Sequence, residues 1–174
     1  EEIPCSCAGR LNFLKAVELA VNGGKDLLTG DSYAADTPDC EAITSFDELM
    51  DIVRIQLRAF AEGCIESAKE REKVQIYLHA SPLLSATYRT SFYGGKDVYA
   101  DYGAKYNNTS VCGMGIASAV DSLYAIKELI FNRKRMSLSD FVDILRKNWE
   151  GEEALRIYIK NRLPKYGNNV RKVD

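Results

Sequence analysis

Apolar residues recur at helical spacing in the first half of the chain. Residues 11–22 are good helix formers, and Gly23-Gly24 follows them as a stop, because glycine accepts the left-handed conformation at a helix end. A second amphipathic stretch begins behind Ser45, which can form a capping box with Glu48, and runs to about residue 72 or beyond. Its apolar stripe is Phe46, Leu49, Met50, Val53, Leu57, Phe60, Cys64 and Ile65. The pattern predicts two helices.

The last third of the chain predicts three more helices. Residues 115–131 are apolar on most sides, which is typical of a helix inside a larger body. Ser137 and Asp140 are placed to cap the next helix, and a short helix over 152–163 ends at Pro164. The fold class expected from this order is helix-rich.

Two stretches between these helices lack periodicity. Residues 25–44 are rich in Gly, Asp, Thr and Pro and predict a surface loop. Residues 83–114 are rich in Gly and Tyr and predict a loop with short extended pieces, such as 109–112, leading into the apolar helix. Within that helix, Asp121 needs a partner in apolar surroundings, so it either caps a nearby loop or faces a polar site.

Composition excludes several classes of protein. The chain has 174 residues, of which 46% are hydrophobic and 28% charged, as in ordinary globular proteins. A net charge of −2 argues against a nucleic-acid surface, and no stretch approaches the ~20 apolar residues that span a membrane. Neither a signal peptide nor an internal repeat or linker is visible. We therefore expect residues 1–174 to form one segment without an internal boundary.

The five cysteines are an odd number at irregular spacing, which predicts free thiols in a reducing cytoplasm. Cys5 and Cys7 form a C-x-C pair, but a metal site would need two further soft ligands, so no metal is expected. The lone histidine, His79, is expected at the end of a helix or strand. Cys64 and Cys112 are expected to be packed thiols.

Four motifs in order resemble the glycyl radical enzymes, the pyruvate formate-lyase-like family. The stretch 102–131 carries Gly-Ala-Lys-Tyr-Asn, a glycine-rich turn and Asp-Ser-Leu-Tyr-Ala-Ile-Lys, with Val120 in place of a small residue. The stretches 11–24, 148–151 and 164–168 resemble the family's N-L-x-K…N-G-G, N-(F/W)-E-G and P-K-Y-G-N. The resemblance covers nearly the whole chain.

The resemblance implies a helix-rich α/β segment of the glycyl radical enzyme barrel. A radical stored on a backbone glycine passes to a cysteine at the barrel centre, and the thiyl radical then attacks a small metabolite inside a site closed to water. A separate iron–sulfur activating enzyme that uses S-adenosylmethionine installs the radical, so no cofactor is expected to be bound here. Members act in anaerobic metabolism, as formate acetyltransferases, dehydratases or lyases, and are often homodimers.

Two decisive motifs of the family are missing. The radical motif R-V-x-G does not occur, and Glu1 to Ala8 offer only Cys5 and Cys7 in place of the cysteine hairpin. Cys7 lies very close to the helix that starts near Arg10, so the nucleophile is expected before Glu1. We expect a fragment that is inactive alone and needs the rest of the barrel, or a complementing chain. The alternatives are a non-catalytic scaffold that binds a partner, and an unrelated α-rich binding domain.

Three residues are candidates for the substrate pocket. Arg10 lies in Ala-Gly-Arg, similar to a Gly-Ala-Arg segment whose arginine helps to hold the substrate carboxylate; it could equally be a surface arginine at a helix start. Tyr106 and Asn107 match the family loop that borders the active site, or form a turn packed under a helix.

Overall fold

The computed structural model describes residues 3–174, which form two compact units. Unit 1 comprises the residues up to Leu11 together with Ala61–Cys112, and unit 2 comprises Asn12–Phe60 and Gly113–Asp174. Helix α2 (Phe46–Leu78) and strands β1 (Cys5–Asn12) and β2 (Asn108–Met114) each contribute residues to both units. That residues 1–174 form one segment stays a prediction. No helix within 3–174 is long and apolar enough to cross a membrane.

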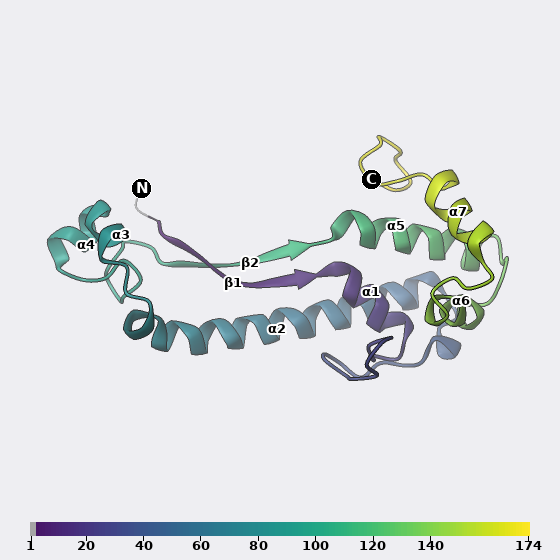
Figure 1. The fold of residues 1–174 in the computed structure, drawn as a ribbon, viewed down its shortest axis with the longest axis horizontal. Helices are drawn as coiled ribbons and strands as arrows, with labels where there is room; N and C mark the ends of the chain where they lie inside the picture. The colour runs from purple at the N-terminus through teal and green to yellow at the C-terminus, as the bar shows by residue number, and fades with distance from the viewer. Residues whose placement is uncertain (1–2) are drawn as a thin grey trace. The chain divides into compact units, whose positions relative to one another are not determined.

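Unit 2 contains most of the helices and a contiguous apolar core. Besides the first half of α2, its helices are α1 (Phe13–Val21), the short η1 (Cys40–Ala42), α5 (Ile116–Ile126), the π-helical η2 (Lys127–Asn132), α6 (Leu138–Arg146) and α7 (Glu153–Arg162) (Figure 1). Leu49 of α2, Leu129 of η2 and Val142 of α6 are completely buried in one cluster. The amphipathic patterns along the sequence therefore converge on a single core.

Helix α1 starts two residues later than its sequence pattern predicts. Leu11 and Asn12 still belong to β1, and the side chain of Asn12 accepts a hydrogen bond from the Lys15 amide at 3.2 Å as the N-cap. The glycine stop is confirmed, because Gly23 and Gly24 both have positive φ. The amide of Gly24 donates to the Leu19 carbonyl at 2.8 Å, which satisfies one of the helix's last acceptors.

The predicted capping box at Ser45 and the predicted cap at Ser137 and Asp140 are confirmed. Ser45 Oγ accepts from the Glu48 amide at 3.2 Å, and Glu48 Oε2 accepts from the Ser45 amide at 3.2 Å. Ser137 and Asp140 make the same reciprocal pair at the start of α6. Behind the first box, α2 extends to Leu78, beyond the predicted residue 72.

Of the two alternatives for Asp121, the structure shows the first: Asp121 caps a nearby loop. Its Oδ1 accepts a hydrogen bond from the Tyr166 amide at 2.8 Å, so the carboxylate caps the loop that follows α7. The prediction that this helix lies inside a larger body is not tested by the described residues. Its first residue, Ile116, is half exposed.

Unit 1 corrects the prediction for residues 83–114. Two short helices, α3 (Pro82–Thr87) and α4 (Arg89–Gly94), stand where a loop was expected. Each is six residues long, which is too short for a 3.6-residue period to show, while Pro82 sits at the helix start, where its missing N–H costs nothing. Among the described residues of this unit, the buried hydrophobic set consists of Ala68, Val98 and Ala104. Unit 1 thus has little apolar core.

Asp26 in unit 2 ties the loop after α1 to that helix. Its Oδ2 pairs with Lys15 Nζ, and its Oδ1 accepts from the amides of Leu28 and Thr29 at 2.7 and 2.9 Å. The bond from Lys15, followed by the bonds from the amides of Thr29 and Leu28, lowers the pKa of Asp26 to about 2.

The lowered pKa of Asp26 predicts how stability depends on pH. Because the folded pKa lies below the unfolded value, the stabilisation is complete above about pH 4 and is lost as the pH falls toward 2. We expect Asp26→Asn to lower the melting temperature at pH 7, and the difference from the wild type to shrink between pH 4 and 2. Thermal unfolding across this range measures it. Glu62→Gln, on an exposed carboxylate of α2, is the control; a constant difference for Asp26→Asn would contradict the assignment.

Candidate functional site

Strands β1 and β2 form a parallel pair. The Asn108 amide at the start of β2 donates to the Pro4 carbonyl just before β1, at 3.2 Å. At the other end, a Cβ on Gly113 would collide with the ring of Phe13, directly after β1. The residue numbers rise together along both strands, and Figure 1 shows both arrows pointing the same way. Parallel strands need a crossover, which here includes α2.

The unit 1 half of α2 covers one face of this pair. A Cβ on Gly9 would lie 2.8 Å from Sγ of Cys64, and Thr109 Oγ1 donates to Glu72, both of them on α2. Because successive side chains of a strand alternate between its faces, Cys5 and Cys7 lie on the same side of β1 as Gly9. Arg10, the residue after Gly9, points to the opposite side of β1. Cys64 packs against β1, as predicted for a packed thiol.

This alternation separates the cysteine candidates from Arg10. Cys5 and Cys7 lie on the Gly9 side of β1 and are both exposed, and Cys7 Sγ makes a weak hydrogen bond to the Gly9 carbonyl at 3.5 Å. Arg10 lies on the opposite face and is exposed, and none of residues 3–174 pairs with its guanidinium. The roles of Cys5, Cys7 and Arg10 stay predictions, but the fold does not bring the two thiols and the guanidinium to one face.

Tyr106 and Asn107 lie at the other end of the strands. They directly precede β2, and the register of Pro4 with Asn108 places Arg10 about six residues further along, or about 20 Å. Tyr106 is half exposed, with Lys105 Nζ 5.2 Å from its ring centroid. The structure therefore does not bring these two candidates together with Arg10.

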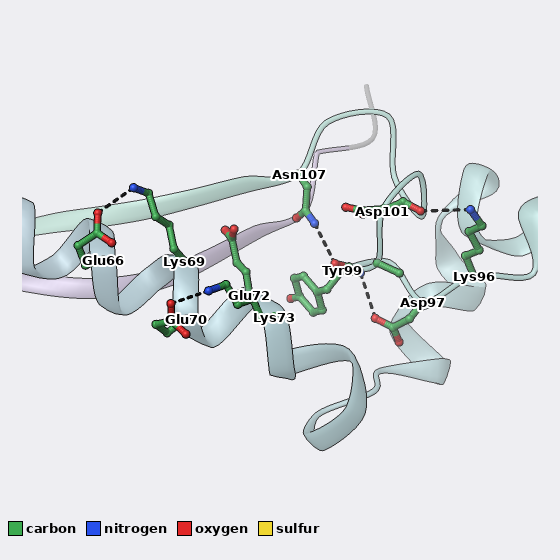
Figure 2. A pocket seen from close by; sticks show the side chains of 11 residues that line it. Glu66, Lys69, Glu70, Glu72, Lys73, Lys96, Asp97, Tyr99, Asp101 and Asn107 are labelled. Carbon is green, nitrogen blue, oxygen red and sulfur yellow. Dashed lines mark hydrogen bonds and ion pairs between the residues drawn. The ribbon is translucent and has the colours of Figure 1, made fainter.

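Asn107 lines a charged cavity of about 1000 Å³ in unit 1 (Figure 2). Its wall consists of Glu66, Lys69, Glu70, Glu72, Lys73, Lys96, Asp97, Tyr99, Ala100, Asp101 and Asn107. Four of the charged residues pair with one another along α2: Glu66 with Lys69 at 2.8 Å, and Glu70 with Lys73 at 2.6 Å. Asn107 Nδ2 donates to the Tyr99 carbonyl at 3.0 Å, which supports the interpretation of Asn107 as a residue that holds a turn.

A polar network that the sequence analysis missed holds the loop 95–107. Asp97 accepts from the Ser81 amide at 2.6 Å and from the Tyr99 amide at 3.0 Å. Ser85 Oγ accepts from the buried Val98 amide at 2.9 Å, and Ser91 Oγ donates to the Gly103 carbonyl at 2.6 Å. The bond between Asp97 and the amide two residues on is an Asx-turn, so an Asp in a Gly-rich stretch was the available signal.

Of the remaining candidates, Cys112 is not where the sequence predicts it, whereas His79 is. The prediction that Cys112 is buried is wrong, because its side chain is exposed on β2. His79 directly follows α2, and its amide donates to the Gln75 carbonyl at 2.8 Å, which confirms a helix-end position. Within residues 3–174, no group of three or more His, Cys, Asp and Glu side chains is placed to hold a metal ion.

Comparison with known proteins matches nearly the whole chain. Residues 2–174 match the family model described as pyruvate formate lyase-like. The chain is 32% identical over 163 residues to (2S)-3-sulfopropanediol dehydratase of Klebsiella oxytoca, covering 93% of this chain and 20% of that protein. It is 32% identical over 161 residues to trans-4-hydroxy-L-proline dehydratase of Clostridioides difficile, covering 92% and 20%. The chain thus spans about a fifth of the length of these relatives.

Solved structures agree with the sequence matches. The glycerol-bound B12-independent glycerol dehydratase from Clostridium butyricum superposes with a TM-score of 0.85 at 25% identity, over 99% of this chain and 22% of that one. A glycyl radical enzyme from Archaeoglobus fulgidus gives 0.81 at 30% identity, over 94% and 20%. The helix-rich chain with its parallel strand pair is accordingly a segment of this α/β barrel fold. The chain belongs to the pyruvate formate lyase-like family of glycyl radical enzymes.

Proposed function

We propose that the protein carrying this chain eliminates a small group from an anionic metabolite by glycyl radical chemistry, and that Arg10 binds the acid group of that metabolite. The named relatives favour elimination over acyl transfer, because they are dehydratases and sulfite-lyases. The substrates in the names of three relatives, sulfopropanediol, hydroxyproline and isethionate, each carry a sulfonate or carboxylate. Since the chain spans about a fifth of its relatives, this activity belongs to the whole protein.

The observation that carries this proposal is the position of Arg10. In α/β barrels the helices form the outer layer and the strands enclose the site. A strand face opposite to α2 therefore points inward, and Arg10 lies on that face near the carboxyl end of β1, where barrel enzymes usually bind ligands. A planar guanidinium without an ion partner among the described residues suits two parallel hydrogen bonds to a sulfonate or carboxylate.

The proposal assigns no radical step to this chain. Cys5 and Cys7 alternate with Arg10 along β1 and lie on the side of Gly9, away from the inward one, and the sequence contains no R-V-x-G motif. The chain supplies barrel wall and a substrate contact, and it is inactive alone. The proposal also includes a glycyl radical installed by an S-adenosylmethionine-dependent activating enzyme. The rest of the barrel, or a complementing chain, supplies the missing motifs. The whole protein is proposed to be a homodimer in the cytoplasm. Tyr106 and Asn107 lie at the amino end of β2, so the proposal places them outside the site around Arg10.

Arg10→Gln in the whole, anaerobically activated protein tests this function. We expect kcat/KM for an anionic substrate such as isethionate or hydroxyproline to fall by about a hundredfold, because charged hydrogen bonds are lost. Turnover of glycerol, which has no charge, is expected to change little. The glycyl radical doublet in electron paramagnetic resonance should keep its amplitude.

Arg58→Gln removes an exposed arginine of α2 and is the matched control. Equal losses for anionic and neutral substrates in Arg10→Gln would show that the residue is structural. No loss for any anionic substrate would remove Arg10 from the site.

A further inference from the structure

Helices α3 and α4 of unit 1 carry polar residues inside and apolar residues outside. The buried residue of α3 is Ser85, and the buried residue of α4 is Ser91. Leu83 of α3 is 87% exposed, and Phe92 and Tyr93 of α4 are 64% and 78% exposed. A helix at the surface of a globular protein normally has the opposite arrangement, with its apolar side turned toward the core. The outward face of these two helices is therefore apolar.

Hydrogen bonds hold both serines in the interior. Ser85 Oγ donates to the Ser81 carbonyl at 2.7 Å and accepts from the buried Val98 amide at 2.9 Å. Ser91 Oγ donates to the Gly103 carbonyl at 2.6 Å. Turning either helix to bury its apolar side would leave these buried donors and acceptors without partners, which is costly. The outward position of the apolar side chains is thus fixed by the polar interior.

The exposed apolar residues continue onto the end of α2, where Figure 1 shows α3 and α4 together. Tyr77 and Leu78, the last two residues of α2, are both exposed. The outer patch is defined as Tyr77, Leu78, Leu83, Phe92 and Tyr93. The described hydrophobic residues that unit 1 buries, Ala68, Val98 and Ala104, are smaller than these. Large apolar side chains that gather at one end of a unit indicate a contact with another protein surface.

The aromatic residues of the outer patch are arranged before any contact forms. The rings of Phe92 and Tyr93 meet edge to face, with 5.5 Å between their centroids. The guanidinium carbon of Arg89 lies 5.9 Å from the centroid of the Tyr93 ring. Tyrosine, phenylalanine and arginine are enriched at the centres of protein contacts. Side chains that already hold one another lose less freedom when a contact forms, which favours binding.

Two observations indicate what covers the outer patch. The chain spans about a fifth of its relatives, so most of each relative lies outside the matched part. Unit 1 has little apolar core of its own, so it needs the cover in order to be stable. A cover within the same molecule is present at a high effective concentration however dilute the protein is, whereas a second copy is lost on dilution.

We propose that the outer patch packs against a part of the whole protein that lies outside these 174 residues and belongs to the same molecule. The covering surface offers an apolar groove that receives Leu83, Phe92 and Tyr93. None of these residues belongs to the site proposed around Arg10, so the contact is independent of the proposed reaction.

Hydroxyl-radical footprinting of the whole protein, without activation, tests whether the outer patch is covered. Mass spectrometry measures the oxidation rate of each side chain in the native protein and in urea. We expect oxidation of Leu83, Phe92 and Tyr93 to be at least about tenfold slower in the native protein, because covered side chains lose contact with water. Leu49, which is completely buried, gives the rate of a covered leucine. Oxidation of the outer patch at the rate found in urea overturns the proposal.

Photo-leucine, incorporated in place of leucine, identifies the cover, because its diazirine inserts into whatever touches residue 83. We expect residue 83 to be joined to residues outside the 174, in a product that keeps the mass of one chain on a denaturing gel. A product of only twice that mass would identify a second copy as the cover. A link only to residues within this chain would show that unit 1 covers itself. Either of these two results overturns the proposal.

Leu83→Ser in the whole protein adds a thermodynamic test. We expect its melting temperature to fall by at least about 2 °C, although Leu83 is exposed in this chain, because an apolar contact with the cover is lost. Ala86→Ser places the same hydroxyl at an exposed position of the same helix and is the matched control. If Leu83→Ser lowers the melting temperature no more than Ala86→Ser does, the outer patch faces water and the proposal is overturned.

Discussion

Leu49→Ala is expected to lower the free energy of unfolding of unit 2 by about 2–5 kcal/mol. Leu49 lies in the first half of α2, is completely buried, and belongs to the apolar cluster that also contains residues of α1, α5 and α6. Deleting its branched end removes buried methyl groups and leaves a cavity that a densely packed core fills only in part. Urea unfolding followed by the fluorescence of Trp149, which packs against Phe141 of the same unit, measures the loss.

Leu28→Ala is the matched control for Leu49→Ala. The same atoms are deleted, but Leu28 is 94% exposed, so the change should stay within about 0.5 kcal/mol. Equal effects of the two substitutions would mean that the cluster around Leu49 is not a packed core.

Gly103→Ala is expected to disorder the loop 95–107 and to cost about 1–3 kcal/mol of local stability. A Cβ at residue 103 would overlap the backbone carbonyl oxygen of Asp97 and lie 3.1 Å from that of Ala100. Backbone atoms cannot rotate aside as a side chain does, so Asp97 must move. That movement breaks the bonds from the amides of Ser81 and Tyr99 to its carboxylate.

Hydrogen exchange of the Val98 amide reports this change, because that amide is buried and donates to Ser85 Oγ. We expect its exchange to accelerate by about tenfold to a hundredfold in Gly103→Ala. Gly94→Ala, where no atom lies within 4 Å of the new Cβ, should leave the exchange rate unchanged. Unchanged exchange in both variants would show that the loop tolerates a side chain at residue 103.

The elements predictable from the sequence are those whose signals are local. Ser45 with Glu48 and Ser137 with Asp140 mark helix starts through neighbouring residues, and the glycine pair after α1 marks a stop. Strand β1 was not predictable in this way. Its residues, Cys-Ser-Cys-Ala-Gly-Arg-Leu-Asn, lack β-branched side chains, and its pairing with β2 joins residues about 100 positions apart.

The candidate site shows the same division. Arg10 could be named from its neighbours in the sequence, but its face depends on the approach of Gly9 to Cys64, a contact between residues 55 positions apart. Arg71 gave no sequence signal, because an arginine on an exposed helix normally reads as a solvated charge. In the structure its Nη1 donates to the Cys7 carbonyl, which lies 64 residues away in the chain.

The polar character of unit 1 has a calorimetric consequence. The heat capacity of unfolding rises with the apolar area exposed and falls with the polar area exposed. Unit 1 is held by hydrogen bonds to Asp97, Ser85 and Ser91 and buries only Ala68, Val98 and Ala104 among its described hydrophobic residues. Its melting should therefore contribute little to the heat-capacity step of the chain. Nearly all of that step, and with it the curvature of stability with temperature, belongs to the apolar cluster of unit 2.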